Sequence, residues 1–466
     1  MTKHLQNTLR AIPSVDAVLT QPAAIPLTDH HGRDVVANAI RTAIDALRAA
    51  LLAGDTLPAD ALSEAAIIEA ATRSLSADQQ PRLKRVVNAT GIVLHTGLGR
   101  AVMPSTVSES IATLTGCCNI QMDLESGDRV KREHCIRDLV CELTGAEDAL
   151  LVNNNAAATL LVLKALAEDK EVVVSRGELI EIGGSFRLPD IMSQSGAKLR
   201  EVGATNKTHA RDYATAICPE TALLLKVHKS NYEIVGFSRE VGIAEIAEIG
   251  REHQIPVVDD LGCGALVDLE HFGLAHEMTV AESLQAGADL ALFSTDKLIG
   301  GPQGGLIVGR ADLLDRIRKH PLYRAFRVGK MTLAALEATL RVFQAPELLP
   351  RKHPVYGMLA KPLEQIKTQA QEAAERLAEG HPQWTIALEA TSARLGGGAL
   401  PGSELPSFAV QIMAPTLSAE ALALQLRQAE VPIIPRIRKT ALLLDMRTVN
   451  GAEVDDVVTA CNNIKD

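Results

Sequence analysis

The spacing of hydrophobic positions changes along the chain and predicts three regions of different secondary structure. Residues 34–54 read DVVANAIRTAIDALRAALLAG, with apolar residues three or four positions apart and a glycine at the end. This pattern predicts an amphipathic helix that stops at Gly54. We expect a small helical domain over residues 1–70.

Short aliphatic runs begin near residue 85 and alternate with amphipathic stretches. The runs include EVVVS, ALLLKVH, IPVVDDLG, DLALFS and GLIVG, and several of them are apolar on both faces. Strands of this kind belong to a mostly parallel sheet covered by helices. The pattern predicts a large α/β domain over residues 71–330.

The pattern of apolar and polar residues changes again after an amphipathic stretch, MTLAALEATLRVF, at residues 331–343. Three later runs, TIALEA, SFAVQIM and TALLLDMR, are separated by helical segments such as SAEALALQLRQAE. Alternation of this kind predicts a smaller α+β domain over residues 331–466.

Composition narrows the possible functions. The chain has 466 residues, 47% of them hydrophobic, a net charge of −10 and only 3% aromatic residues, so neither general nucleic-acid affinity nor base stacking is indicated. Seven cysteines occur without a CxxC pair or metal-ligand spacing, which is typical of reduced thiols in a cytoplasmic protein. No stretch reaches the roughly 20 apolar residues that a membrane span needs.

One lysine stands out at the end of a predicted strand. Residues 290–309 read LALFSTDKLIGGPQGGLIVG, with Lys297 three positions after Ser294 and four glycines following. Ligands of open α/β sheets bind at the carboxyl ends of strands, so Lys297 faces the expected site, although a solvated surface lysine is the alternative. A lysine that forms a Schiff base, a hydroxyl for a phosphate and a glycine loop together indicate pyridoxal 5'-phosphate.

Two other segments meet the remaining needs of that cofactor. The turn LLVNNNAAATLL places Asn154, Asn155, Ala156 and Ala157 at a helix N-terminus, where backbone N–H groups bind phosphate. A second strand ends on Asp259 and Asp260, and either carboxylate is suited to pairing with the pyridine nitrogen. The order of phosphate loop, aspartate and lysine predicts a fold-type I pyridoxal-phosphate enzyme. A nucleotide-binding α/β protein is the competitor, but the chain has no G-x-G-x-x-G or Walker A sequence.

Five longer segments of the sequence resemble a known protein family. The chain resembles the bacterial selenocysteine synthases, the L-seryl-tRNA(Sec) selenium transferases, over about residues 80–345. The resemblance is carried by VNATGIVLHTGLGRA, GAEDALLVNNNAAATLL, EVVVSRGELIEIGGSFRLPDIM, LLLKVHKSNYEIVGF and FSTDKLIGGPQGGLIVG. It implies conversion of L-seryl-tRNA(Sec) to L-selenocysteinyl-tRNA(Sec) with selenophosphate, through a pyridoxal-phosphate aldimine on Lys297 and a dehydroalanyl-tRNA intermediate.

The resemblance also implies roles for further residues. The anion-binding arginines of the family fall on Arg100, Arg132, Arg324 and Arg327. Asp296 is suited to assisting proton transfer or to holding Lys297 in place, and the holding role is the one we expect. From the residues alone, Ser294 is expected to bind the phosphate and Asp260, of the aspartate pair, to contact the cofactor. His228 lies where a residue contacting the cofactor ring is expected, with a structural histidine as the alternative.

Some positions depart from the family pattern. Gly97, Thr295 and Cys263 stand where Asn, Gly and Ser are more familiar, and none of these changes removes a catalytic group. Cys263 is either an oxidation-sensitive thiol or, as we expect, a buried inert one.

The expected partners are seryl-tRNA(Sec), selenophosphate and further copies of the chain, because family members form large ring-shaped homo-oligomers and a decamer is implied. The N-terminal region is expected to contact tRNA, although its five basic and eight acidic residues are no electrostatic footprint for RNA. Two alternatives stay open: a pyridoxal-phosphate lyase or transferase for a small free amino acid, and a catalytically silent tRNA-binding protein.

Overall fold

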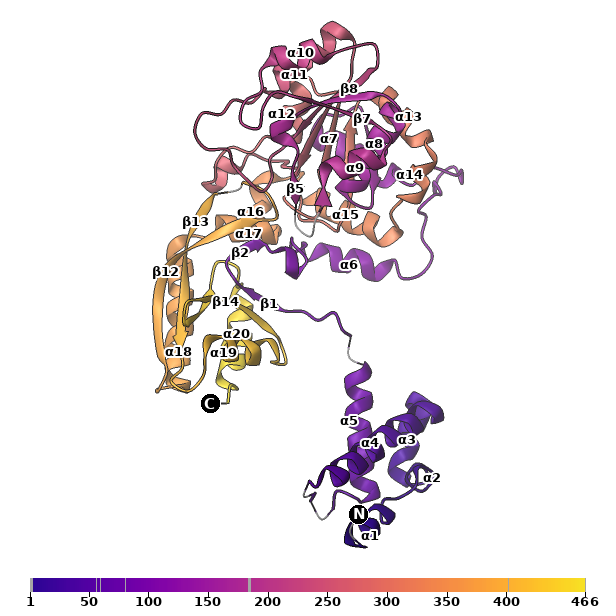
Figure 1. The fold of residues 1–466 in the computed structure, drawn as a ribbon, viewed down its shortest axis with the longest axis vertical. Helices are drawn as coiled ribbons and strands as arrows, with labels where there is room; N and C mark the ends of the chain where they lie inside the picture. Colours follow the sequence, from indigo (N-terminus) through magenta and orange to yellow (C-terminus); the bar gives the residue numbers. More distant parts are fainter. Residues whose placement is uncertain are drawn as a thin grey trace. The chain divides into compact units, whose positions relative to one another are not determined.

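The computed structural model describes residues 3–55, 57–58, 60–79, 81–182, 186–400 and 402–465. It divides the chain into two compact units, Met1–Arg85 and Val86–Asp466 (Figure 1). The first boundary expected from the sequence, at residue 70, lies inside helix α5 (Glu64–Gln79). That helix continues because Ala71 and Leu75 belong to the same buried cluster as Ile67.

Every secondary-structure element described in the N-terminal unit is a helix. Its remaining helices are α1 (Lys3–Arg10), α2 (Val15–Leu19), η1 (Pro22–Ala24), α3 (Ile25–His31) and α4 (Arg33–Ala53). The helix predicted over residues 34–54 is confirmed as α4, and Gly54 ends it in the left-handed conformation at φ 90°. Val18, Ile40 and Ile44 on α2 and α4 pack against α5 and form a separate core.

A seven-stranded sheet forms the centre of the second unit, in the order β3-β11-β10-β9-β8-β4-β7. All neighbouring pairs are parallel except the two that involve β11. The aliphatic runs of the sequence are confirmed as strands. Their bounds are β3 (Asp148–Val152), β4 (Glu171–Ser175), β7 (Lys198–Val202), β8 (Thr221–Val227), β9 (Val257–Gly262), β10 (Leu290–Ser294) and β11 (Gly305–Gly309).

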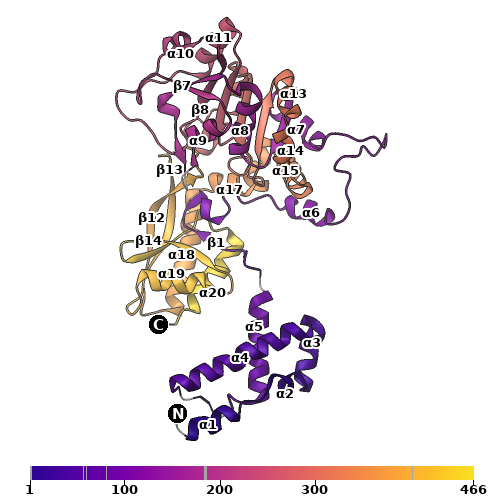
Figure 2. The same ribbon diagram turned by 45° about the vertical axis from the view of Figure 1, so that its right-hand side comes forward.

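Helices cover both faces of this sheet (Figure 2). Alternate residues explain why: Leu151 and Phe293 belong to one buried cluster, while Leu150 and Leu292 belong to the cluster on the other side. The helices are α6 (Thr106–Thr113), α7 (His134–Thr144), α8 (Asn155–Ala167), α9 (Leu188–Gln194), α10 (Ala210–Ala216), α11 (Ile243–His253), α12 (Val280–Gln285), α13 (Ala311–Lys319), α14 (Pro321–Ala325) and α15 (Lys330–Val342).

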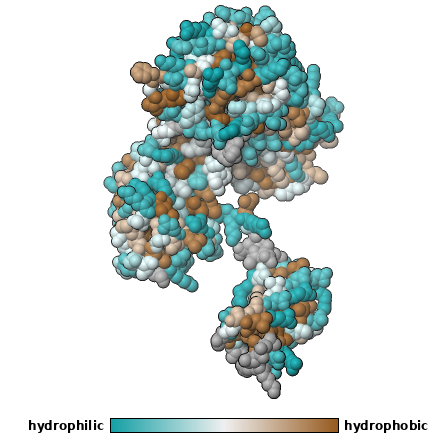
Figure 3. All heavy atoms as spheres, in the orientation of Figure 1, coloured by the Kyte–Doolittle hydropathy of each residue, from teal (hydrophilic) through white to brown (hydrophobic). Residues whose placement is uncertain are grey.

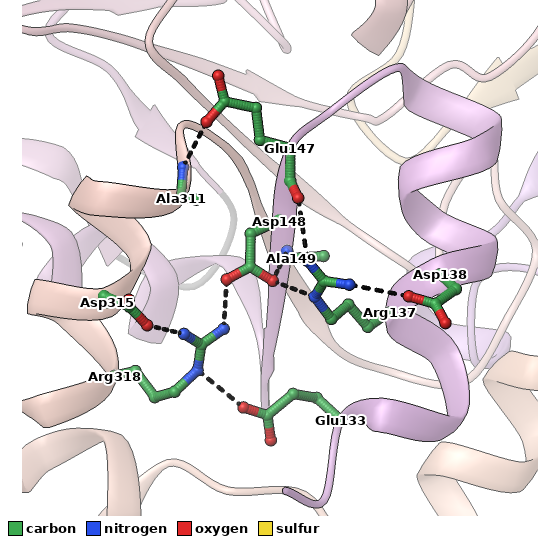
Figure 4. A network of polar contacts seen from close by, with 9 residues as sticks. All are labelled: Glu133, Arg137, Asp138, Glu147, Asp148, Ala149, Ala311, Asp315 and Arg318. Carbon is green, nitrogen blue, oxygen red and sulfur yellow. Dashed lines mark hydrogen bonds and ion pairs between the residues drawn. The ribbon is translucent and has the colours of Figure 1, made fainter.

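An ion-pair network fixes two of these helices to the edge strand β3 (Figure 4). Asp148 accepts hydrogen bonds from Arg137 Nε of α7 and from Arg318 Nη2 of α13, both at 2.6 Å. Burial alone would raise the pKa of Asp148, but the two guanidinium groups hold it below its usual range. Arg318 Nε also donates to Glu133, the N-cap residue of α7, at 3.1 Å. Arg318 therefore links α13 both to β3 and to the start of α7.

A six-stranded sheet, in the order β1-β14-β15-β13-β12-β2, forms the rest of this unit. Its strands are β1 (Val87–Ala89), β2 (Ile92–Leu94), β12 (Thr385–Gly396), β13 (Glu404–Met413), β14 (Ile433–Arg438) and β15 (Ala441–Asp445). Its helices are α16 (Leu349–Lys352), α17 (Pro354–Ala360), α18 (Leu363–Gly380), α19 (Ala419–Arg427) and α20 (Val454–Asn462). Residues 87–94 therefore complete a sheet whose other strands begin only at Thr385. The boundary expected at residue 331 lies inside α15.

The visible face in Figure 3 carries mostly polar side chains with smaller apolar patches between them. Within the part of the chain that the structure describes, no helix combines the length and the apolar character needed to cross a bilayer.

Candidate active site

A cavity of about 290 Å³ lies at the carboxyl ends of β8, β9 and β10, where an open α/β sheet binds its ligand. Its lining consists of Arg100, Asn154, Asn155, Ala156, Thr159, Ile180, Leu188, Val227, His228, Ser230, Asp260, Gly262, Ser294, Lys297 and Gln303. A larger cavity of about 640 Å³, beside α17 and the six-stranded sheet, contains none of the residues expected at the site. The smaller cavity is therefore the candidate active site.

Lys297 is held in the loop that follows β10. The loop is fixed from behind, because Tyr356 donates to the carbonyl oxygen of Leu298 at 3.0 Å and His353 Nε2 lies 2.9 Å from the carbonyl oxygen of Ile299. The lysine is only 8% exposed. Burial lowers its pKa below the usual range, which increases the fraction of neutral, nucleophilic amine.

The structure separates the two aspartates that end β9. Successive residues of a strand point to opposite faces, so Asp259 turns away and accepts a hydrogen bond from Ser283 Oγ at 2.6 Å. Asp260 lines the cavity and accepts from Asn155 Nδ2 at 2.7 Å and Thr159 Oγ1 at 2.9 Å. Burial raises the pKa of both carboxyls, that of Asp259 to about 6. Asp260 is the aspartate that faces the ligand site.

The Asn-rich turn forms the N-terminus of α8 beside the cavity. Asn154 is the N-cap, and its Oδ1 accepts the backbone N–H of Ala157 at 2.9 Å. Ala157 is therefore buried behind the turn, while Asn154, Asn155 and Ala156 line the cavity. A Cβ at Gly305 would lie 2.3 Å from the carbonyl oxygen of Asn154, so only glycine lets β11 pass so close to this turn.

Arg100 enters the cavity from a loop near the start of the unit. Its Nη1 lies 2.6 Å from Asp296 Oδ2, so the residue before the lysine forms an ion pair rather than facing the ligand directly. Arg100 has a positive φ of 63°, a strained conformation for a residue with a side chain. The ion pair and this backbone strain occur together at the cavity wall.

The structure does not bring the other three arginines into this cavity. Arg132 Nη1 donates to the carbonyl oxygen of Val328 at 2.9 Å, and Arg132 and Arg327 line a separate small pocket with Tyr323. Arg324 is exposed on α14, which ends at Ala325 and so leaves Arg327 outside the helix. Arg100 is therefore separated from the rest of the expected arginine set in a single chain.

His228 and Ser294 line the cavity as the sequence predicts. The backbone N–H of His228 donates to the carbonyl oxygen of Asp260 at 3.0 Å, which anchors the end of β8 to β9. Three polar residues that line the cavity, Thr159, Ser230 and Gln303, are not among those expected from the sequence. Thr159 lies one helical turn after Asn155 and was detectable from that spacing, whereas Gln303 gave no separate signal within its glycine loop.

The cysteines form no disulfide in the described part of the chain. All seven are free. Cys263 is 1% exposed and burial raises its pKa well above the usual range, which makes it an inert buried thiol.

Comparison with known proteins gives consistent matches. The family model described as L-seryl-tRNA selenium transferase matches residues 86–450, and the one described as selenocysteine synthase N terminal matches residues 9–48. The L-seryl-tRNA(Sec) selenium transferase of Geotalea uraniireducens (strain Rf4) is 46% identical over 458 residues, covering 98% of this chain and 99% of that one. The enzyme of the same name from Methylocella silvestris is 46% identical over 444 residues, covering 94% of each chain.

Among solved structures, D-glucosaminate-6-phosphate ammonia-lyase aligns with a TM-score of 0.57 at 20% identity. The alignment covers 84% of this chain and 96% of that one. At this level of identity the likeness concerns the fold, and that fold is the fold-type I architecture expected from the order of the motifs.

Proposed function

Because the chain belongs to the L-seryl-tRNA selenium transferase family, we propose that it converts L-seryl-tRNA(Sec) to L-selenocysteinyl-tRNA(Sec) with pyridoxal 5'-phosphate bound at Lys297. The observation that carries the proposal is the convergence of three groups on one cavity of about 290 Å³: a buried lysine, a buried aspartate and a helix N-terminus. Each group comes from a different part of the sequence, and together they match the functional groups of the cofactor.

The residues present fit that cofactor. The N-terminus of α8 and the Ser294 hydroxyl are suited to the phosphate, and Asp260 to the pyridine nitrogen. Asn155 Oδ1 is buried without a hydrogen-bond partner among the described residues, which supports a ligand at this turn. When bound, the cofactor would supply an electron-withdrawing ring that stabilises negative charge at the Cα of an attached seryl group.

The side chains of the cavity perform the remaining tasks. Neutral Lys297 takes the Cα proton, and Asp260, held by hydrogen bonds from Asn155 and Thr159, is the carboxyl group suited to the pyridine nitrogen. The proton held by Lys297 leaves with the seryl β-hydroxyl as water. The β-carbon of the resulting dehydroalanyl group accepts selenium from selenophosphate, and hydrolysis of the Se–P bond then releases phosphate and leaves the selenol. Arg100 provides the fixed positive charge that an anionic donor such as selenophosphate requires, and Asp296 holds its guanidinium in place.

Other parts of the proposal extend beyond the cavity. We propose that Arg132, Arg324 and Arg327 serve the anionic substrates of a neighbouring copy in a ring-shaped homo-oligomer, for which light scattering should give a decamer mass. The N-terminal unit would contact the tRNA. The seven free cysteines support a cytoplasmic location.

The decisive experiment compares seryl-tRNA(Sec) with seryl-tRNA(Ser), each supplied with selenophosphate, and analyses the amino acid released from the tRNA. Selenocysteine should form from the first tRNA alone. In parallel, borohydride reduction should fix the cofactor to Lys297 in the wild type and in Lys198→Ala, an exposed control, but not in Lys297→Ala. Absence of selenocysteine from both tRNAs, in a protein that carries the cofactor on Lys297, would refute the substrate assignment.

A further inference from the structure

We infer that Glu277 is a positioning residue that orients the His228 ring over the cofactor site and fixes its tautomer. Glu277 is 5% exposed and does not line the cavity. Its Oε1 lies 3.5 Å from His228 Nε2 and 2.8 Å from Cys263 Sγ. The inference rests on the proposed function, because it assigns a role toward the cofactor bound at Lys297.

The partners of Glu277 indicate why a carboxylate is buried here. A buried carboxylate is costly unless donors satisfy it. Among the described residues, no lysine or arginine forms an ion pair with Glu277. Its partners are the Cys263 thiol, which donates a hydrogen bond, and the His228 ring, whose Nε2 lies within ion-pair distance. Burial raises the pKa of Cys263, so the thiol keeps its proton and donates it to the carboxylate. Both partners adjoin the cavity, since His228 lines it and Cys263 follows Gly262, which also lines it.

The backbone holds this carboxylate in a fixed place. A parallel bridge joins Ala265 to Thr279, and the N–H of Val280 donates to the carbonyl oxygen of Ala265 at 2.9 Å. Thr279 also caps α12 in a reciprocal capping box with Glu282. The segment that carries Glu277 is therefore tied to the same end of β9 that supplies Asp260.

The histidine is tied to that strand end as well. Its backbone N–H donates to the carbonyl oxygen of Asp260. The residues that carry the His228 ring and the Glu277 carboxylate are therefore both anchored to the end of β9. A carboxylate beside Nε2 selects the tautomer that carries its proton on Nε2. Nδ1 is then the acceptor nitrogen, and it is buried without a partner among the described residues. The ring is thus fixed in orientation and in proton position where it meets the cavity.

Metal binding is the competing use of these side chains. His228, Cys263 and Glu277 each offer one ligand atom, and these atoms lie within 4.8 Å of one another. The contact of 2.8 Å between Sγ and Oε1 is a hydrogen-bonding contact with a protonated thiol, whereas zinc would require the thiolate. The geometry favours the positioning role.

The test uses Glu277→Ala, the nearly isosteric Glu277→Gln and the shorter acid Glu277→Asp in the full-length chain. Glu248→Gln, an exposed carboxylate on α11, is the matched control. The first readout is the dissociation constant of pyridoxal 5'-phosphate from the apoprotein, measured by absorbance titration. We expect about tenfold weaker binding for Glu277→Ala, a smaller loss for Glu277→Gln, near-complete rescue by Glu277→Asp and no change for the control.

The second readout is the pH midpoint of the absorbance band of the lysine-linked cofactor, which should move in Glu277→Ala and Glu277→Gln. The kcat should fall in both while the KM for seryl-tRNA(Sec) stays constant. Wild-type values for Glu277→Ala in binding and in pH midpoint would overturn the inference. So would equal melting-temperature losses and equal binding losses in all three Glu277 variants, because these indicate a purely structural role.

Two further results separate the alternatives. If EDTA removes a bound metal from the wild type and reproduces the spectrum of Glu277→Ala, the cluster is a metal site and the positioning role is wrong. If the wild type never forms the lysine-linked band, the proposed function itself fails. A normal wild-type band with unchanged Glu277 variants refutes only the inference about Glu277.

Discussion

Lys297 acquires its chemistry from burial rather than from its residue type. A solvated lysine is almost fully protonated at neutral pH, whereas the low exposure of Lys297 lowers its pKa. Asp260 shows the opposite effect for an acid, since burial raises its pKa while Asn155 and Thr159 stabilise the carboxylate by hydrogen bonds. At the residue scale, the surroundings of each group shift its pKa and so decide how readily it gains or loses a proton.

The ion pair between Arg100 and Asp296 leads to a first prediction. Arg100→Ala should leave a nearly buried carboxylate without its cation, lowering the free energy of unfolding by about 1–3 kcal/mol and kcat by at least about tenfold. Urea unfolding and steady-state turnover of seryl-tRNA(Sec) measure the two effects. Arg394→Ala breaks an exposed pair with Glu404 and should leave the free energy of unfolding nearly unchanged. Equal losses in both variants would contradict the prediction.

His353 behind the lysine loop leads to a pH-dependent prediction. Burial lowers its pKa to about 4, below the unfolded value near 6.5, so the unfolded chain takes up a proton first as the pH falls. Stability is therefore lost below about pH 6.5, and this residue should account for about 2 kcal/mol between pH 7 and pH 5.

His353→Gln retains a donor toward the carbonyl oxygen of Ile299 but cannot titrate. Its free energy of unfolding, measured by urea at pH 7 and pH 5, should change by about 2 kcal/mol less than that of the wild type. An identical pH dependence in the two proteins would rule out this contribution.

At the scale of elements, the site is built where strands end and loops meet. Strands β8, β9 and β10 end on His228, Asp260 and Lys297 or within a few residues of them. Because β8, β9 and β10 are parallel, their carboxyl ends lie side by side at the same end of the sheet. Strand β11 runs antiparallel between β10 and β3 and brings the glycine loop against the N-terminus of α8.

This close packing predicts the effect of one added methyl group. Gly305→Ala would place a Cβ against the carbonyl group of Asn154, so the N-terminus of α8 must shift. We expect a loss of about 1–3 kcal/mol in unfolding free energy and weaker binding of pyridoxal 5'-phosphate. Gly116→Ala, where the Cβ meets nothing within 4 Å, should leave cofactor binding unchanged. Chemical unfolding and absorbance titration decide between these outcomes.

At the scale of the whole molecule, the chain consists of two units with separate cores. The N-terminal unit buries Val18, Ile40 and Ile44 within its own helices. The second unit contains every residue that lines the candidate active site. Strands β1 and β2 belong to the six-stranded sheet of that unit, so the chain crosses from helices into this sheet immediately after Arg85.

This division predicts that cofactor binding and tRNA binding can be separated. A chain that starts at Val86 should fold and bind pyridoxal 5'-phosphate with the affinity of the full-length protein, because the cavity lies wholly within the second unit. The same chain should lose at least about tenfold in affinity for seryl-tRNA(Sec), which a filter-binding assay measures. Full tRNA affinity in the shortened chain would refute the role proposed for the N-terminal unit.

The sequence by itself indicated the α/β class, the principal strands, α4 and a set made of Asn154, Asn155, Lys297 and the aspartate pair at 259 and 260. These features are local, because periodicity, capping and the order of motifs are properties of neighbouring residues. It also marked Arg100 and His228, through resemblance to a family rather than through physics.

Only the tertiary structure decided the features that depend on distant parts of the chain. Strand pleating chose Asp260 over Asp259, and the sheet order brought residues 87–94 beside β14 and β12. Packing placed Arg100 in the cavity and Arg324 outside it, and it gave His228 its buried partner Glu277. Contacts between residues far apart in the sequence do not show in the local spacing of apolar and polar residues. Which site residues are buried, and which pair with one another, is therefore decided only when the chain folds.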